Sequence, residues 1–280
     1  MQLCNEGDDR GNVEDRRGFQ VGGIHLGLGG LLVVGVLSLV FRTNLFSVLG
    51  QGAEQGQSGA PAAQTGPQVD QRKQAEQGLE KIAVGSFNDV QKTWAQTLRG
   101  YQAAKMVLFW DETQSGCGGA QSAMGPFYCP ADERVYLDLG FYKELATRFG
   151  APGDFAQAYV VAHEVGHHVQ KLMGISGKVE QARQRDPSVR NALSVKLELQ
   201  ADCFAGVWGH SAAQRKLLDP GDVDQGLRAA ASVGDDRIQK MAGRRVSPES
   251  FTHGSAEQRS SWFKRGLDKG DPKACDTFAE

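Results

Sequence analysis

The sequence predicts an α+β domain that is mainly helical with a small β-sheet, preceded by one transmembrane helix. Three observations lead to this prediction. An uncharged apolar run covers residues 21–41, a stretch poor in large apolar side chains follows it, and short extended segments then give way to several helical patterns. A small sheet followed by helices is typical of α+β proteins and not of a repeating βαβ fold.

The chain is long enough for one large domain or two small ones, with 280 residues. Its 31 Lys and Arg residues against 33 Asp and Glu residues give a formal net charge of −2. Domains that bind nucleic acids usually carry a basic patch, and this composition gives no such signal. We therefore expect no nucleic-acid partner.

Residues 21–41 contain no Asp, Glu, Lys or Arg. About 20 apolar residues are enough to cross the hydrocarbon core of a bilayer as a helix. A soluble core helix and a cleaved signal peptide are the alternatives. The polar residues before the run, its length and the lack of a small-residue cleavage site after it favour an uncleaved transmembrane signal anchor.

The basic residues around this run predict its orientation. Arg10, Arg16 and Arg17 precede it, whereas Arg42 alone follows it within the next 20 residues. Because Lys and Arg are enriched on the cytoplasmic side, residues 1–20 should be a cytoplasmic tail of a single-pass protein of the cell membrane. The rest of the chain is then expected outside the cytoplasm, in the periplasm if the cell is Gram-negative.

Residues 42–78 are expected to be a flexible linker. From residue 50 onward this stretch is rich in Gln, Gly, Ala, Ser and Pro and has almost no large apolar residues. Such a composition cannot bury enough surface to offset the entropy of ordering the chain. The folded domain is therefore expected at residues 79–280, a normal size for one core.

Within this domain, residues 86–98 are predicted to form a helix and residues 104–110 a short strand. Residues 126–129 and 134–138 flank the turn PADE and resemble a β-hairpin. Helical patterns follow at 141–149, 154–173, 188–210 and 223–231.

The expected membrane segment divides the five cysteines. Cys4 precedes it, and the other four follow it, an even number in a compartment that permits disulfides. Cys117 and Cys129 flank the proposed turn region and are the preferred pair, which leaves Cys203 with Cys275. The alternative for Cys203, which has an apolar helical context, is a free buried thiol. The absence of C-x-x-C argues against a thiolate zinc site.

Residues 162–170 read AHEVGHHVQ, in which His163, Glu164 and His167 form the pattern H-E-x-x-H. On a helix, residues four apart lie on one face, so two imidazoles can reach one metal ion. The pattern predicts a zinc site with these two histidines as ligands. Gly166 lowers helix stability and predicts that another element packs closely against it.

A catalytic zinc ion usually takes three protein ligands and leaves a position for water. Glu198 and Asp202, in the segment LELQADCFAG, are four residues apart on a predicted helix, so both carboxylates project from one face. We assign Glu198 as the third ligand and Asp202 as the acceptor of the free N–H of a ligating imidazole. The reversed roles are one alternative, and pairing of both carboxylates with surface Lys or Arg is another.

Glu164 is expected to act as the general base, taking a proton from a water activated by the metal and passing it to the leaving amine. His253, in FTHGSAEQR, is the candidate donor to the developing oxyanion, because a His beside Gly on a loop can reach a cleft. The alternative for His253 is a surface histidine. Arg259 could anchor that loop or a nearby carboxylate.

Two further features lie close to the motif. His168 should point about 100° away from His167 around the helix, so we expect it to be structural or exposed. The hairpin containing Tyr128 and Tyr136 could supply an edge strand that binds an extended substrate, with these residues either lining the cleft or packing.

Together, NVEDRRG, the apolar segment, HEVGHHVQ, ELQADCFAG and THGSAEQR resemble the putative neutral zinc metallopeptidase family of bacteria. That family is similar at its site to the thermolysin-like gluzincins, in which a Glu from a later helix completes the zinc shell. The resemblance implies a zincin-like fold and one Zn²⁺ ion. The residues that it implies are His163, His167 and Glu198 on zinc, Glu164 as base, Asp202 in support and His253 near the oxyanion.

The sequence therefore predicts a membrane-anchored zinc peptidase that hydrolyses a peptide or protein substrate outside the cytoplasm. A non-catalytic zinc-stabilised binding or scaffold protein of the envelope is the alternative. Glu164 and His253 argue against it, because a structural site would be closed by a fourth protein ligand. A metal-dependent hydrolase of non-peptide amides is a third interpretation.

Overall fold

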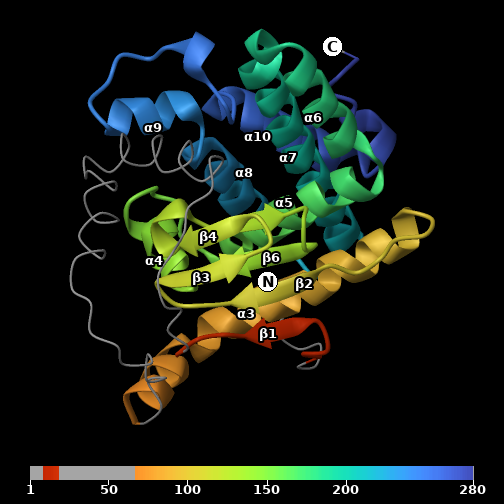
Figure 1. Ribbon diagram of the computed structural model, residues 1–280. Coiled ribbons are helices and arrows are strands. Elements are labelled where there is room, and N and C mark those ends of the chain that lie inside the picture. The colour runs from red at the N-terminus through yellow and green to blue at the C-terminus, as the bar shows by residue number, and fades with distance from the viewer. Residues whose placement is uncertain (1–8, 19–66, 280) are drawn as a thin grey trace.

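The computed structural model describes residues 9–18 and 67–279. The α+β class, mainly helical with small sheets, is confirmed for these residues (Figure 1). Across the two described ranges, no helix is both long and apolar enough to cross a membrane. The signal anchor predicted at 21–41 lies outside the described residues.

A four-stranded sheet has the order β1-β2-β6-β5. Its strands are β1 (Val13–Asp15), β2 (Lys105–Leu108), β5 (Phe127–Cys129) and β6 (Arg134–Leu137). β1, β2 and β6 are parallel, whereas β5 is antiparallel to β6 and forms one edge. The central strands β2 and β6 are buried along most of their length, which explains their continuous apolar sequences. The strand expected at 104–110 and the hairpin around PADE are both present.

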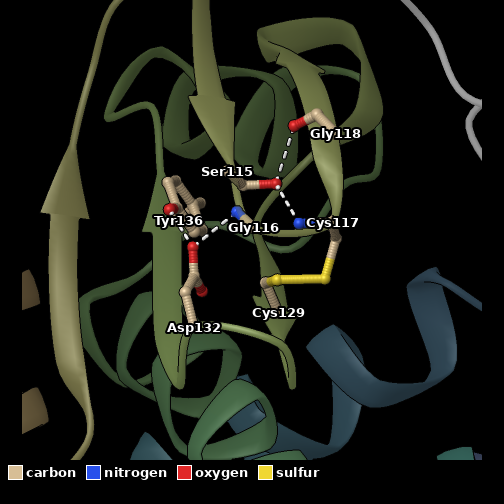
Figure 2. The surroundings of a disulfide bond; sticks show 7 residues. All are labelled: Ser115, Gly116, Cys117, Gly118, Cys129, Asp132 and Tyr136. Carbon is tan, nitrogen blue, oxygen red and sulfur yellow. Dashed lines mark hydrogen bonds between the residues drawn. A yellow bond between two sulfur atoms is a disulfide. The ribbon is translucent and has the colours of Figure 1, made fainter.

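A second hairpin, which the sequence analysis did not predict, is formed by β3 (Glu112–Ser115) and β4 (Gly118–Gln121). Figure 2 shows the disulfide between Cys117 in its turn and Cys129 at the end of β5. The carboxylate of Asp132 accepts hydrogen bonds from the Gly116 amide and the Tyr136 hydroxyl, each at 2.6 Å. These contacts hold the β3–β4 turn against the main sheet.

Helices make up most of the remaining described residues. The predicted helices at 141–149, 154–173, 188–210 and 223–231 correspond to α4 (Gly140–Thr147), α5 (Asp154–Leu172), α7 (Arg190–Gln214) and α8 (Asp222–Ser232). Three others were not predicted: α6 (Ile175–Arg185), α9 (Asp235–Met241) and α10 (Ala256–Lys269). A capping box between Ser255 and Gln258 begins α10, so the helix starts within the segment that we expected to be a loop.

The helix α3 (Pro67–Thr97) begins well before the predicted helix at 86–98. The assignment of residues 67–78 to the flexible linker is therefore wrong. Gln, Glu, Lys and Arg are good helix formers despite their polarity, and composition alone did not distinguish a polar helix from a tether. Glu76 stabilises this part of α3 by pairing with Arg72 at 3.2 Å and accepting a hydrogen bond from the Trp110 indole at 2.9 Å.

The amino-terminal segment belongs to the same fold, because β1 pairs with β2 at the edge of the sheet farther from α7 and α10 (Figure 1). The side chain of Arg17 is 1% exposed and contacts the carboxylates of Asp15, Glu76 and Glu80. The prediction separated residues 1–20 from the domain by a membrane. For residues 9–18 that separation is wrong, because two strands of one sheet cannot lie on opposite sides of a bilayer.

Glycines bring the main helices close together. A Cβ atom at Gly166 of α5 would lie 3.0 Å from the Ala201 carbonyl oxygen of α7, which confirms the expected close packing. At Gly206 of α7 and Gly266 of α10, an added Cβ would overlap the backbone of the opposing helix. The disulfide between Cys203 and Cys275 joins α7 to the carboxyl-terminal segment, as expected. Gly254, which precedes α10, lies beside Val195 and Leu199 of α7.

We expect Arg17→Met to lower the free energy of unfolding by about 3–5 kcal/mol, because it removes the buried cation that three carboxylates share. Denaturation of the full chain in detergent would measure the loss. Arg10→Met is the control: Arg10 also contacts Glu80, but its side chain is 48% exposed, so the loss should be about 1 kcal/mol or less. Equal losses in the two variants would contradict the structural importance of Arg17.

The shared sheet also predicts the result of topology mapping. Single cysteines at the exposed positions Asp9 and Lys143, in a chain carrying Cys4→Ser, should react with a membrane-impermeant maleimide in the same cell preparation. Labelling of one position before permeabilisation and of the other only afterwards would show that β1 is absent from the sheet in the cell.

Candidate metal centre

Three side chains from α5 and α7 converge on one point. Single donor atoms of His163, His167 and Glu198 all lie within 4.8 Å of one another. The Nε2 atom of His163 is 3.2 Å from Glu198 Oε2, and the Nε2 atom of His167 is 3.5 Å from Glu198 Oε1. The structure thus brings together the three residues that the sequence analysis assigned as ligands.

The antiparallel arrangement of α5 and α7 produces this convergence. Along α5, His163 contacts Asp202, His167 approaches Glu198 and Gln170 contacts Leu197. Residue numbers rise on one helix as they fall on the other, so both pairs of residues four apart face each other.

The Asp202 carboxylate orients His163. Its Oδ1 atom lies 2.8 Å from the His163 Nδ1 atom and also accepts a hydrogen bond from the Tyr159 hydroxyl. Arg259 of α10 donates to both carboxylate oxygens, at 2.8 and 2.9 Å. With its proton on Nδ1, His163 presents Nε2 toward Glu198. Arg259 therefore contacts a nearby carboxylate, one of its two expected roles.

Gln170 holds His167, a contact that the sequence analysis missed. The Nδ1 atom of His167 lies 2.9 Å from Gln170 Oε1. The amide nitrogen of Gln170 in turn donates to the Leu197 carbonyl at 2.7 Å and to Gln200 at 3.1 Å. The i, i+3 spacing on one helix was the available signal, since such residues are neighbours on its surface.

Glu164 is 8% exposed and lies outside the cluster of three donors. Burial raises the pKa of its carboxyl above the ordinary value, and the nearby imidazoles oppose that change. A backbone hydrogen bond from Tyr128 of β5 also reaches the carboxylate. Glu164 is thus a carboxylate with raised basicity beside the three donors.

His253 lies on a loop that Asp235 holds in place. The Oδ2 atom of Asp235 accepts the amide N–H groups of Thr252, His253 and Gly254, at 2.7, 2.6 and 3.1 Å. The His253 side chain is 43% exposed, with Nδ1 3.3 Å from Asp235 Oδ1. Burial tends to lower its pKa, but Asp235 and the charge of Glu198 raise it overall. Asp235 was missed, because no local pattern connects it with His253.

The family model described as putative neutral zinc metallopeptidase matches residues 3–278 of this chain. The chain belongs to this family. It is 46% identical to the protein YpfJ of Escherichia coli K12 over 285 residues, which cover 96% of each chain. It is 45% identical to the protein Rv2575 of Mycobacterium tuberculosis H37Rv over 207 residues, 70% of this chain and 69% of that one. No solved structure matches.

The donor set fits the zinc that the family's description suggests. Two imidazole nitrogens and one carboxylate oxygen are ligands that zinc takes in catalytic sites, with a further position for water. Burial opposes protonation of His163, but Asp202 and Glu198 raise the pKa of its imidazole to about 10. The negative charges that favour a proton on this ring also favour a divalent cation at the same place.

We expect Asp202→Asn to weaken zinc binding by about 10–100-fold, because an amide makes His163 a less basic ligand than a carboxylate does. Competition against a chelator of known affinity would measure the change. Asp268→Asn is the control, since Asp268 pairs with Lys264 on the exposed face of α10. Zinc affinity unchanged in Asp202→Asn would show that Asp202 does not support the metal ligand.

Proposed function

We propose that this protein is a membrane-anchored zinc-dependent peptidase that hydrolyses peptide bonds with a metal-activated water and Glu164 as general base. The observation that carries the proposal is that the metal donors and the buried carboxylate at the site are different residues. Three side chains supply metal donors, while the buried Glu164 lies beside them without belonging to the set. A purely structural zinc site would instead be closed by a fourth protein ligand.

Each residue at the site has a separate part in the proposed reaction. His163, His167 and Glu198 would hold zinc, which when bound supplies Lewis acidity and lowers the pKa of a coordinated water. The Glu164 carboxylate accepts a proton and delivers it to the amine of the leaving peptide. His253, held by Asp235 near Glu198, donates a hydrogen bond to the oxygen of the scissile carbonyl.

The substrate is proposed to be an extended peptide. β5 is the edge of the four-stranded sheet that carries Tyr128, whose backbone contacts Glu164. An extended chain added to this edge would place its peptide bonds beside the base, and main-chain hydrogen bonds would give affinity without strict sequence preference. The alternative, a non-catalytic zinc-stabilised scaffold, predicts bound zinc without turnover.

Membrane attachment through residues 21–41 remains part of the proposal and rests on the sequence. The two disulfides support a location of the domain outside the cytoplasm, because such bonds persist in oxidising compartments. In this arrangement residues 9–18 lie on the same side as the domain. Residues 21–41 would then attach to the bilayer without crossing it as a single span, which revises the single-pass topology expected from the sequence.

Glu164→Gln should bind zinc as the unaltered chain does and lose about 10²–10⁴-fold in the rate of peptide cleavage. The measurement combines metal analysis with turnover of a fluorogenic peptide library by the full chain. Glu257→Gln, at an exposed position of α10, is the matched control and should retain full activity. Equal cleavage by the Glu164→Gln variant and the unaltered chain would exclude Glu164 as the base.

A further inference from the structure

The helix α5 carries two pairs of functional side chains. His163 and His167 are four residues apart, and so are Glu164 and His168. Because successive residues turn about 100° around a helix, the second pair lies on a face adjacent to the first. The first pair faces Asp202 and Glu198 of α7, whereas the second faces β5.

One residue of β5 contacts both members of the second pair. The Tyr128 hydroxyl lies 2.9 Å from His168 Nδ1, and the backbone of Tyr128 hydrogen-bonds the Glu164 carboxylate. The Tyr128 and His168 rings also pack edge to face, with centroids 5.4 Å apart. Tyr128 therefore spans one turn of α5: its side chain contacts His168, and its backbone amide contacts Glu164, the proposed base.

His168 is itself fixed in orientation. It is fully buried, and its Nε2 atom lies 2.6 Å from the Gln102 carbonyl oxygen. A carbonyl only accepts, so Nε2 carries the proton and Nδ1 accepts the Tyr128 O–H. Tyr101 packs edge to face against the same ring at 5.6 Å. We expected His168 to be structural or exposed. It is buried, and both of its ring nitrogens are hydrogen-bonded.

We propose that His168 is a positioning residue for the peptidase reaction, acting through Tyr128 on Glu164. By accepting the Tyr128 hydroxyl proton, His168 fixes β5 against α5, and the Tyr128 amide then holds the Glu164 carboxylate in one orientation. The inference rests on the proposed function. A carboxylate that is limited to one rotamer is more often correctly oriented to accept the proton of the water than a freely rotating one.

Apolar packing alone would not require this arrangement. A buried imidazole and a buried hydroxyl each cost free energy unless hydrogen-bonded, and a Leu or Phe in either position would fill the space without that requirement. The chain instead has a hydrogen bond from the Tyr128 hydroxyl to His168, which fixes the position of Tyr128 relative to α5. That position matters because the strand containing Tyr128 is also the proposed substrate-binding edge.

Tyr128→Phe is the sharpest test, because it removes only the hydroxyl and keeps the ring and the backbone N–H. We expect kcat to fall roughly 10-fold, with KM and zinc content unchanged. Tyr142→Phe is the matched control: the Tyr142 hydroxyl is also buried but has no hydrogen-bond partner within the described residues, so kcat should not change. An unchanged kcat in Tyr128→Phe would overturn the proposal, as would an equal loss in the control.

Combination with Glu164→Gln separates positioning from general destabilisation. If Tyr128 acts through the base, Tyr128→Phe should not slow the residual cleavage further once the base is gone. A full additional 10-fold loss in the double variant would overturn the proposal. If the unaltered chain and Glu164→Gln cleave equally, the proposed function fails and the positioning role fails with it.

Amide hydrogen exchange gives a readout that does not depend on activity. In the metal-free chain, the amide of residue 128 should be protected, and exchange should be faster in both Glu164→Ala and His168→Phe. Protection that persists in His168→Phe while the melting temperature is unchanged would show that His168 does not hold the strand. Faster exchange at residue 128 with the rest of the sheet protected is the expected result.

Discussion

The candidate metal centre depends on one buried carboxylate, that of Asp202. Asp202 belongs to α7, and side chains from two other helices bond to its carboxylate, namely Tyr159 and His163 of α5 and Arg259 of α10. A buried ion pair is weak evidence for net stability, because desolvation costs nearly as much as pairing returns. Its value here is geometric, since only one arrangement of the three helices satisfies every donor. Removing Asp202 or Arg259 would break the 2.8 Å ion pair between them and leave the remaining charge buried.

Such short connections require helices that approach more closely than usual. Aspartate has a single methylene, so Asp202 reaches His163 only because α5 and α7 touch at Gly166 and Ala201. The contact between Gly206 and Gly266 likewise brings α10 near enough for Arg259 to reach the same carboxylate. The glycines that lower intrinsic helix stability thus place the residues that orient His163, a proposed metal ligand.

Local sequence periodicity predicted the helices and strands that contain the candidate site residues. It did not predict contacts between residues that are distant in sequence. The helices α5 and α7 and the β5–β6 hairpin have strong local patterns, so spacing alone could place Glu198 and Asp202 on one helix face, although it left their roles interchangeable. Asp235 acts on a loop 18 residues away, a contact that no local pattern encodes. β1 has three residues, and its partner strand begins at Lys105, so its pairing depends on the tertiary structure. The polar start of α3 was mistaken for a linker because helix formers and linker residues overlap in composition.

The two faces of α5 are supported by different parts of the molecule, so the proposed metal ligands and the proposed base are positioned separately. The face with His163 is fixed by α7 and α10, whereas the face with Glu164 meets β5. Cys129 follows Tyr128 directly, so the disulfide to Cys117 restrains the strand that contacts the base. Reduction of that bond would loosen β5 without touching the metal ligands. An oxidising compartment is therefore the environment in which both faces of the helix are held, because disulfides persist there.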